Sequence, residues 1–267
     1  ANYLAPAAAG SWCFSLNLAS ISGSLTRLTN FCWCHSNLKT RAPTSLSTSR
    51  STTRNTRSRT DISCGKPGVG YDRHEILDRS VLYDGFNRLT RLLYRYRKCD
   101  GDWSAPLERE IFQRGPAAAI LPYDPVRDAI VMVEQFRPGA LLSGENPWQV
   151  EPIAGICDVG ETPEATVRRE AMEEAGCTLG HIVPACAYLV SPGCVDEKVH
   201  VFCGSVDSST IGTLGGMETE NEETIVHVLD FATCLEGLRK QRFSYALTIL
   251  ALQWLTLHRE ELRQTWC

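Results

Sequence analysis

Apolar and polar positions alternate in short runs between residues 80 and 155, a pattern that predicts β-strands. Two or three antiparallel strands are expected in SVLYDGFNRLTRLLYRYR (residues 80–97), where YDGFN supplies a turn. A hairpin of two apolar strands is expected in AAAILPYDPVRDAIVMVEQFR (residues 117–137), with DPVRD as its turn. One further strand is expected in WQVEPIAG (residues 148–155).

The second half of the chain mixes strand patterns with helical ones. Two strands flanking a Ser-Pro-Gly loop are predicted in ACAYLVSPGCVDEKVHVFCGSV (residues 185–206), and another in ETIVHVLDF (residues 223–231). The glycine-rich acidic stretch IGTLGGMETENEET (residues 211–224) is typical of a mobile surface loop. Two helices are predicted in FATCLEGLRKQR (residues 231–242) and YALTILALQWLTLHREELRQ (residues 245–264). This order predicts an α/β layered domain preceded by an antiparallel strand unit.

Charge is unevenly distributed along the chain. Residues 1–60 hold twenty Ser or Thr residues and seven Lys or Arg, with no Asp or Glu. This composition is typical of an organellar transit peptide, but we favour the simpler interpretations, a disordered tail or a non-native leader without a recognisable domain up to residue 70. Residues 61–267 hold 31 acidic against 20 basic residues, a net charge of about −11, which argues against nucleic-acid binding. No run of 18 apolar residues occurs, so no membrane span is predicted.

Five of the twelve cysteines fall among apolar residues: Cys157, Cys177, Cys186, Cys203 and Cys234. We expect them to be small buried side chains of a reducing compartment. The predicted location is therefore the cytoplasm, or an organelle if residues 1–60 are a transit peptide. CWCH (residues 32–35) offers three potential zinc ligands, but no second cluster at finger-like spacing completes a site.

A helix of thirteen residues is predicted between Thr162 and Gly176. Thr162 can cap its start, Pro163 suits its first position, and Gly176 can end it in the left-handed conformation. At 100° per residue, three carboxylates fall within an arc of about 100°, namely Glu170, Glu173 and Glu174. The opposite side is expected to pack on a sheet through Ala165, Ala171, Met172 and Ala175.

The clustered carboxylates favour a bound cation over a solvated acidic surface, which is the ordinary interpretation of a charge run. At about 6 Å and an effective dielectric near 20, each pair of carboxylates repels by about 2–3 kcal/mol. The C-terminal half of a helix disfavours negative charge further, and Arg169 can neutralise only part of it through Glu173, four residues away. Carboxylates and a loop carbonyl suit Mg²⁺, which takes phosphate oxygens as remaining ligands.

The spacing of this segment resembles the Nudix box at every position that the box defines. The nine matching residues are Gly155, Glu161, Arg169, Glu170, Ala171, Glu173, Glu174, Gly176 and Cys177. The resemblance implies a Nudix fold, a mixed β-sheet sandwiched between helices, with a small antiparallel strand unit before it. It also implies Mg²⁺-dependent hydrolysis of a nucleoside diphosphate linked to another group, with Mn²⁺ able to substitute.

From about residue 74 onward the chain is similar to bacterial ADP-ribose pyrophosphatases. The likeness is carried by REIFQRGPAAAILPYDPVRD, VEQFRPGA, NPWQVEPIAG, SPG and ALQWLTLHREELRQTW. In that family, a proline at the offset of Pro192, 16 residues after Gly176, marks the members that cleave ADP-ribose. The resemblance implies a diphosphatase that yields AMP and ribose 5-phosphate. It divides the chain into a strand and dimerisation unit at residues 71–115 and a Nudix hydrolase domain at residues 116–267.

The resemblance also implies roles for individual residues. The metal ligands are the main-chain carbonyl of Ala154 and the carboxylates of Glu170, Glu174 and Glu222. The catalytic candidates are Glu220 as general base, Glu197 as a second candidate base, and Glu173 as a ligand or an immediate neighbour of the ligands. Glu161 is expected to brace the loop. Closure of the mobile loop that carries Glu220 and Glu222 would exclude water from the site.

Substrate contacts are implied for Phe86, Arg109, Arg137 and Ser191. The two arginines suit phosphate groups, Ser191 suits the terminal ribose, and Phe86 suits the adenine ring. In the family this aromatic residue can come from a partner subunit through exchanged N-terminal strands, so a homodimer is expected. Two alternatives stay open: a hydrolase of another nucleoside diphosphate sugar, such as GDP-mannose, and an ADP-ribose sensor that binds without cleaving. The intact carboxylates argue against the sensor.

Overall fold

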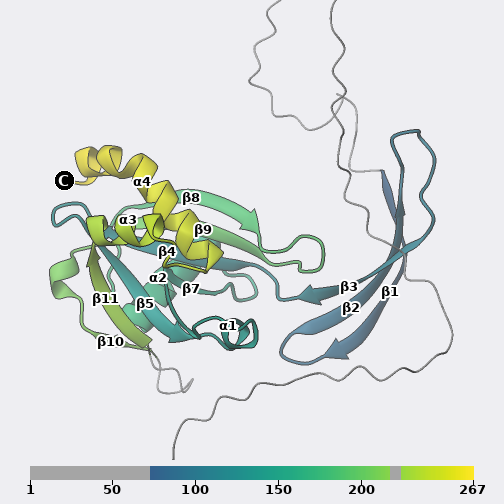
Figure 1. Ribbon diagram of the computed structural model, residues 1–267, viewed down its shortest axis with the longest axis horizontal. Coiled ribbons are helices and arrows are strands. Elements are labelled where there is room, and N and C mark those ends of the chain that lie inside the picture. Colours follow the sequence, from purple (N-terminus) through teal and green to yellow (C-terminus); the bar gives the residue numbers. More distant parts are fainter. Residues whose placement is uncertain (1–72, 217–223) are drawn as a thin grey trace, which may run out of the picture. The chain divides into compact units, whose positions relative to one another are not determined.

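Residues 73–216 and 224–267 are described by a computed structural model (Figure 1). Three predictions concern residues outside these ranges: the leader at residues 1–60, the CWCH stretch, and the acidic residues Glu220 and Glu222. These three stay predictions. Among the helices of the described ranges, none is both long enough and apolar enough to cross a membrane.

The described chain begins with a small antiparallel sheet of its own. It consists of β1 (His74–Asp84), β2 (Arg88–Tyr96) and β3 (Leu107–Gln113), in that spatial order. The predicted turn in YDGFN joins β1 to β2, and the backbone N–H of Gly85 donates to the carbonyl of Asn87 there. The hydroxyl of Thr90, which is buried, donates to the side chain of Gln113 and so links β2 to β3. The predicted N-terminal strand unit is confirmed.

The larger sheet mixes parallel and antiparallel strands around β4. In spatial order its main strands are β10 (Leu214–Gly215), β11 (Thr224–Asp230), β5 (Ala129–Phe136), β4 (Ala117–Asp124), β9 (Lys198–Ser205) and β8 (Ile182–Leu189). β4 pairs with β9 in parallel, and the neighbouring pairs of the described sheet are antiparallel. Strands that are buried on both faces read as continuous apolar runs, which is the pattern of β4 and β5.

The stretch WQVEPIAG forms two strands, so the prediction of a single strand is wrong. β6 (Trp148–Glu151) pairs with β5, and β7 (Ile153–Ile156) pairs with β4. Pro152 separates them because its ring fixes φ and removes a backbone donor, so the chain leaves one neighbour and joins another. The predicted hairpin of β4 and β5 is therefore short, with direct pairing confined to the two residues at each strand end next to the turn.

Helices cover both faces of the larger sheet (Figure 1). They are α1 (Pro138–Leu142), α2 (Pro163–Ala175), the 3-10 helix η1 (Ser208–Thr210), α3 (Phe231–Arg239) and α4 (Ala246–Trp266). The alternation along β5 sends Ile130 and Met132 into the core beneath α4, and Val131 and Val133 into the core beneath α2. The predicted α/β fold with a mixed sheet between helices is confirmed, whereas the short α1 and η1 were not predicted.

Four of the five cysteines expected in the interior are buried: Cys157, Cys177, Cys203 and Cys234. Cys186 is exposed, so its predicted burial is wrong. It lies on β8, the edge strand of the larger sheet, where no further strand shields it among the described residues. Burial raises the pKa of the Cys177 thiol to about 12, so this thiol stays protonated.

Candidate active site

The helix α2 begins and ends where its capping residues predict. The hydroxyl of Thr162 accepts a hydrogen bond from the backbone N–H of Ala165, and Pro163 is the first helical residue. Gly176 takes a left-handed conformation with φ of 59°. The N–H groups of Gly176 and Cys177 then bond to the carbonyls of Met172 and Ala171, which closes the helix in a Schellman arrangement.

The buried face of α2 differs from the predicted one. Its buried residues are Thr166, Val167, Ala171, Glu174 and Ala175. Ala165 and Met172, which were expected against the sheet, are exposed. The carboxylate side of the helix therefore borders the sheet instead of lying opposite to it. The prediction failed because it placed Glu170, Glu173 and Glu174 together on the solvent side, whereas Glu174 finds polar partners inside the protein.

The carboxylates of Glu170 and Glu174 both lie on the backbone of β7. A Cβ atom built at Gly155 would be 1.7 Å from Oε1 of Glu170, so the side chain of Glu170 occupies the space that a larger residue would need. The backbone N–H of Ala154 donates to Oε2 of Glu174 over 3.3 Å. Glycine at position 155 thus lets one carboxylate approach the strand next to the other.

Glu174 is almost completely buried, with 7% of its surface exposed. Its Oε1 accepts a hydrogen bond of 2.7 Å from Nε2 of Gln135, which also donates to the hydroxyl of Thr224. Burial raises the pKa of Glu174 to about 7; the bond from Gln135 lowers it and the charge of Glu170 raises it. Gln135 was missed as a site residue, although a glutamine within the apolar run of β5 was a usable signal.

Arg169 lies among three carboxylates and bonds to each of them. Its Nη1 donates to Glu170 and Glu173, both over 2.8 Å, and its Nε and Nη2 donate to Glu161 over 3.2 Å. The bond from Arg169 is the largest effect that lowers the pKa of Glu161 to about 2. Glu161 also accepts from the N–H of Asp158 and the hydroxyl of Thr166, contacts that brace the loop before α2. Arg169 therefore neutralises more of the cluster than its spacing from Glu173 suggested.

The donor chemistry of this cluster fits a hard divalent cation. Two carboxylates of α2, Glu170 and Glu174, meet the backbone of β7, and Glu173 joins Glu170 through Arg169. Oxygen donors of this kind suit Mg²⁺ and Mn²⁺. The guanidinium of Arg169, placed between Glu170 and Glu173, shows that a positive charge is accommodated there. In the described ranges, no three His, Cys, Asp or Glu side chains are already arranged as a metal site.

Arg137 extends the site along β5. It follows the last residue of that strand, and its Nε donates over 2.9 Å to Glu151, which is completely buried. Its backbone is extended like that of the strand, so its side chain projects on the same face as that of Gln135, which donates to Glu174. The positive charge of Arg137 lowers the pKa of Glu174. Burial raises the pKa of Glu151 against the effect of the hydrogen bond from Arg137. Glu151 was not predicted as a site residue.

Ser191 and Glu197 lie on the loop between β8 and β9, which is tied to the end of β3. Asp196 of this loop accepts hydrogen bonds from the backbone N–H groups of Arg114 and Gly115. Glu197 forms an ion pair of 3.6 Å with Arg114, a residue that the sequence patterns did not single out. The pKa of the Tyr245 hydroxyl is raised, first by burial and then by the charges of Glu151 and Glu197.

Arg109 and Phe86 belong to the small sheet and are exposed. Arg109 lies on β3, where its Nη1 donates to the carbonyl of Glu108, and Phe86 lies in the turn between β1 and β2 with 91% of its surface exposed. In the described part of the chain, no hydrogen bond or ion pair joins either residue to α2. The structure thus brings Ala154, Glu170, Glu173, Glu174 and Arg137 together, but not Arg109 or Phe86.

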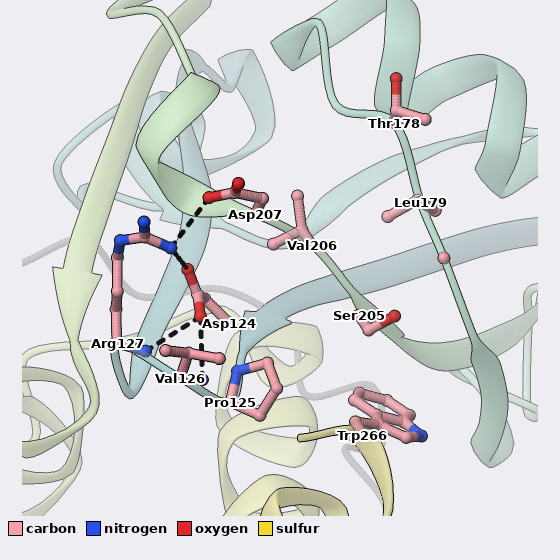
Figure 2. Close-up of a pocket in the computed structure, with 11 residues that line it drawn as sticks. Asp124, Pro125, Val126, Arg127, Thr178, Leu179, Ser205, Val206, Asp207 and Trp266 are labelled. Carbon is pink, nitrogen blue, oxygen red and sulfur yellow. Dashed lines mark hydrogen bonds and ion pairs between the residues drawn. The ribbon is translucent and has the colours of Figure 1, made fainter.

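A separate hollow of about 420 Å³ lies beside the turn between β4 and β5 (Figure 2). Arg127 and Asp207 form an ion pair on one side of it, and Trp266 lies on another. Asp124 is buried and accepts bonds from the backbone N–H groups of Val126 and Arg127 (Figure 2). None of the predicted site residues lines this hollow. Its polar groups are occupied with each other and serve the fold.

Comparisons with known proteins agree with this geometry. A family model described as "NUDIX domain" matches residues 113–247. The chain is 40% identical over 192 residues to an ADP-ribose pyrophosphatase of Escherichia coli, covering 72% of this chain and 92% of the relative. It is 32% identical over 185 residues to a GDP-mannose pyrophosphatase of Cronobacter sakazakii, covering 68% and 95%.

A solved structure supports the same fold. It is titled "Crystal structure of ADP compounds hydrolase" and superposes with a TM-score of 0.54 at 17% identity, covering 73% of this chain and 97% of the other. At this identity the likeness speaks for the fold alone. The family model and the curated relatives show the family as well, because they match the segment that forms α2 and β7. On this evidence, the chain belongs to the NUDIX family of hydrolases.

Proposed function

We propose that the protein hydrolyses the diphosphate of ADP-ribose, with Mg²⁺, to AMP and ribose 5-phosphate. The observation that carries the proposal is the placement of Glu170 and Glu174 on the backbone of β7, with Glu173 bonded to the same arginine as Glu170, in a chain 40% identical to an ADP-ribose pyrophosphatase. Water attacks one phosphorus, the bond from that phosphorus to the bridging oxygen breaks, and the bridging oxygen leaves with the other phosphate.

The residues of the chain divide this work between them. When bound, Mg²⁺ offsets the charge of the diphosphate and lowers the pKa of the attacking water. Glu170, Glu174 and the carbonyl of Ala154 hold it, together with Glu222. Glu220 takes the proton of the attacking water, with Glu173 and Glu197 as the other candidate bases. Arg137 and Arg109 bind the phosphates, and Ser191 binds the terminal ribose.

The assembly that suits this function is a homodimer in which the small sheets are exchanged. Several large apolar side chains of β1 and the following turn are exposed: Ile76, Val81, Tyr83 and Phe86. A small antiparallel sheet needs an apolar face packed against another element for stability. A second copy of the chain supplies that element, and it brings Phe86 to the adenine ring of its partner's substrate. The cytoplasm remains the predicted compartment.

GDP-mannose is the second candidate substrate, because a GDP-mannose pyrophosphatase is 32% identical to the chain. The carboxylate cluster serves either substrate, since both contain the same diphosphate. Purified protein should be assayed in parallel with ADP-ribose and GDP-mannose at saturating Mg²⁺, with chromatography of the released nucleotide. We expect AMP to form faster than GMP. Faster GMP release would transfer the assignment to GDP-mannose, and tight binding without any release would identify a sensor.

The mechanism is tested by Glu170→Gln, which keeps the shape of the side chain and removes its charge. We expect kcat to fall by at least ~10³-fold, which corresponds to about 4 kcal/mol of barrier. Glu236→Gln is the matched control, because Glu236 is an exposed residue of α3 that pairs with Lys240. Near-normal turnover by Glu170→Gln at saturating Mg²⁺ would remove the proposed metal role.

A further inference from the structure

Glu151 has a buried carboxylate of which only one oxygen forms hydrogen bonds. Its side chain is completely buried at the end of β6. Arg137 directs both Nε and Nη2 to the same oxygen, Oε1. The other oxygen, Oε2, is buried and has no hydrogen-bond partner within the described part of the chain. Buried carboxylate oxygens are nearly always bonded, so an unpaired one calls for an explanation.

Stability does not provide that explanation. A buried ion pair loses the hydration of both charges, and replacing such pairs by apolar residues is often neutral or stabilising. Here the penalty is greater, because one oxygen of Glu151 gains no bond in return. A glutamate at this position is therefore expected to serve the one group that it contacts, which is the guanidinium of Arg137.

Glu151 fixes the side chain of Arg137 but not its backbone. The backbone of Arg137 is held independently, since its N–H donates to the carbonyl of Pro147 over 2.7 Å and its carbonyl accepts from Ala140 at the start of α1. The side chain, by contrast, is 39% exposed, and in the described residues its hydrogen bonds go to Glu151 alone. Without Glu151 a long arginine side chain would adopt many rotamers.

We propose that Glu151 is a positioning residue that orients the guanidinium of Arg137 toward the diphosphate of the substrate. The inference rests on the proposed function, in which Arg137 binds phosphate. Two of the five N–H groups of the guanidinium bond to Glu151, which leaves the remaining edge for phosphate oxygens. Gln135, two residues before Arg137 in the same extended run, donates to Glu174, so the side chain of Arg137 leaves the strand on the face that carries the carboxylate cluster.

The test is Glu151→Gln, which keeps the size of the side chain and removes its charge. We expect kcat/KM for ADP-ribose to fall by about 10- to 100-fold, the cost of a misplaced binding group, with most of the loss in KM. Arg137 keeps its charge and is 39% exposed, so water can hydrate it, and the unfolding temperature should fall by no more than a few degrees. A purely structural role would lower the unfolding temperature and leave KM unchanged.

A second background makes the test specific to Arg137. Arg137→Lys keeps the charge beside Glu151, so the protein should fold, but an ammonium group is a point charge without the planar fork. Adding Glu151→Gln to this variant should change kcat/KM by less than about 3-fold, because the residue acts through the fork. Asp128→Asn is the matched control, since Asp128 also accepts two bonds from one arginine, Arg259, at the opposite end of β5.

The outcomes separate this inference from the proposed function. Equal losses from Glu151→Gln in both backgrounds, with an active wild type, overturn the positioning role alone. An unchanged KM in the folded Glu151→Gln variant overturns it as well. A wild type that cleaves neither ADP-ribose nor GDP-mannose overturns the proposed function, and this inference with it.

Discussion

Gly155 lies where the side chain of Glu170 reaches the backbone of β7. A Cβ atom there would meet three side-chain atoms of Glu170, the nearest at 1.7 Å, and these atoms are the far end of a flexible side chain. The clash can therefore be relieved by moving Glu170 without moving the backbone. The glycine is required for the position of a carboxylate more than for the conformation of the loop.

Gly155→Ala should accordingly separate activity from stability. We expect kcat to fall by at least about 100-fold, because a displaced ligand misplaces the reacting groups, while the unfolding temperature changes by only a few degrees. Differential scanning fluorimetry and steady-state kinetics on the same samples measure both. Gly139→Ala is the control, since a Cβ at Gly139 meets no atom within 4 Å. Wild-type kcat in Gly155→Ala would show that Glu170 tolerates the shift.

At the scale of single residues, the sequence predicts which carboxylates form the cluster, but it does not predict their hydrogen-bond partners. The spacing of Glu170, Glu173 and Glu174 follows from helical geometry alone. The bond from Gln135 to Glu174 joins residues 39 positions apart, and local periodicity carries no information about such pairs. For the same reason the spacing from Arg169 to Glu173 was visible, whereas the contact of Arg169 with Glu161 depends on the path of the loop before α2.

The turn between β4 and β5 is the element whose stability depends most clearly on pH. Asp124 is 1% exposed and accepts bonds from the backbone N–H and the hydroxyl of Ser208. It also accepts bonds from the backbone N–H groups of the turn itself (Figure 2). Burial raises the pKa of this carboxyl, but the hydrogen bonds from Arg127 and Ser208 outweigh it and hold the pKa below the usual 3.8. The stabilisation is therefore present above pH 3.8 and is lost as pH falls toward the folded pKa.

Asp124→Asn should remove this pH-dependent contribution. At pH 7 we expect the free energy of unfolding to fall by about 1.5–3 kcal/mol, the usual value of hydrogen bonds to a charged group. The difference from wild type should narrow below pH 3.8, because Asp124 then binds a proton in the unfolded chain while it stays ionised in the folded protein, which lowers the stability of wild type. Urea denaturation of both proteins at pH 7, 4 and 3 measures this difference in the free energy of unfolding. Asp207→Asn, at the exposed partner of Arg127, should have a much smaller effect; equal effects would contradict the argument.

Most helices and strands could be predicted from apolar periodicity and capping residues. Which strands pair with each other could not be predicted in this way. The limits of α2 followed from Thr162, Pro163 and Gly176, which act on the backbone next to them. The parallel pairing of β4 with β9 brings together segments about 80 residues apart, and burial patterns do not state which strands are neighbours. Pro152 did signal the break between β6 and β7, since proline removes a donor from a sheet.

At the scale of the whole molecule, the exposed apolar side chains of the small sheet predict the state of assembly. The pair Val81→Glu and Tyr83→Glu places two charges on β1, where these side chains are 52% and 63% exposed. We expect analytical ultracentrifugation to show a dimer for wild type and a monomer for this variant, because buried unpaired charges oppose association. Activity should fall with the dimer, since Phe86 is then absent from the partner's site.

A control outside the small sheet makes this experiment specific. Val126 is 71% exposed in the turn between β4 and β5, so Val126→Glu adds a charge at a comparable apolar surface position. It should leave sedimentation unchanged. A wild-type monomer at micromolar concentration would contradict the exchange of N-terminal strands, while leaving the chemistry of the carboxylate cluster untouched.

Arg169 gives the cluster a counter-ion that belongs to the chain. In the mechanism that we propose, a dication held at Glu170 and Glu173 would therefore exchange with a guanidinium that is already bonded there. Its net gain would be the difference between two opposing Coulomb energies, smaller than three bare glutamates would provide. Without the ion, the guanidinium keeps the glutamates from repelling one another unopposed.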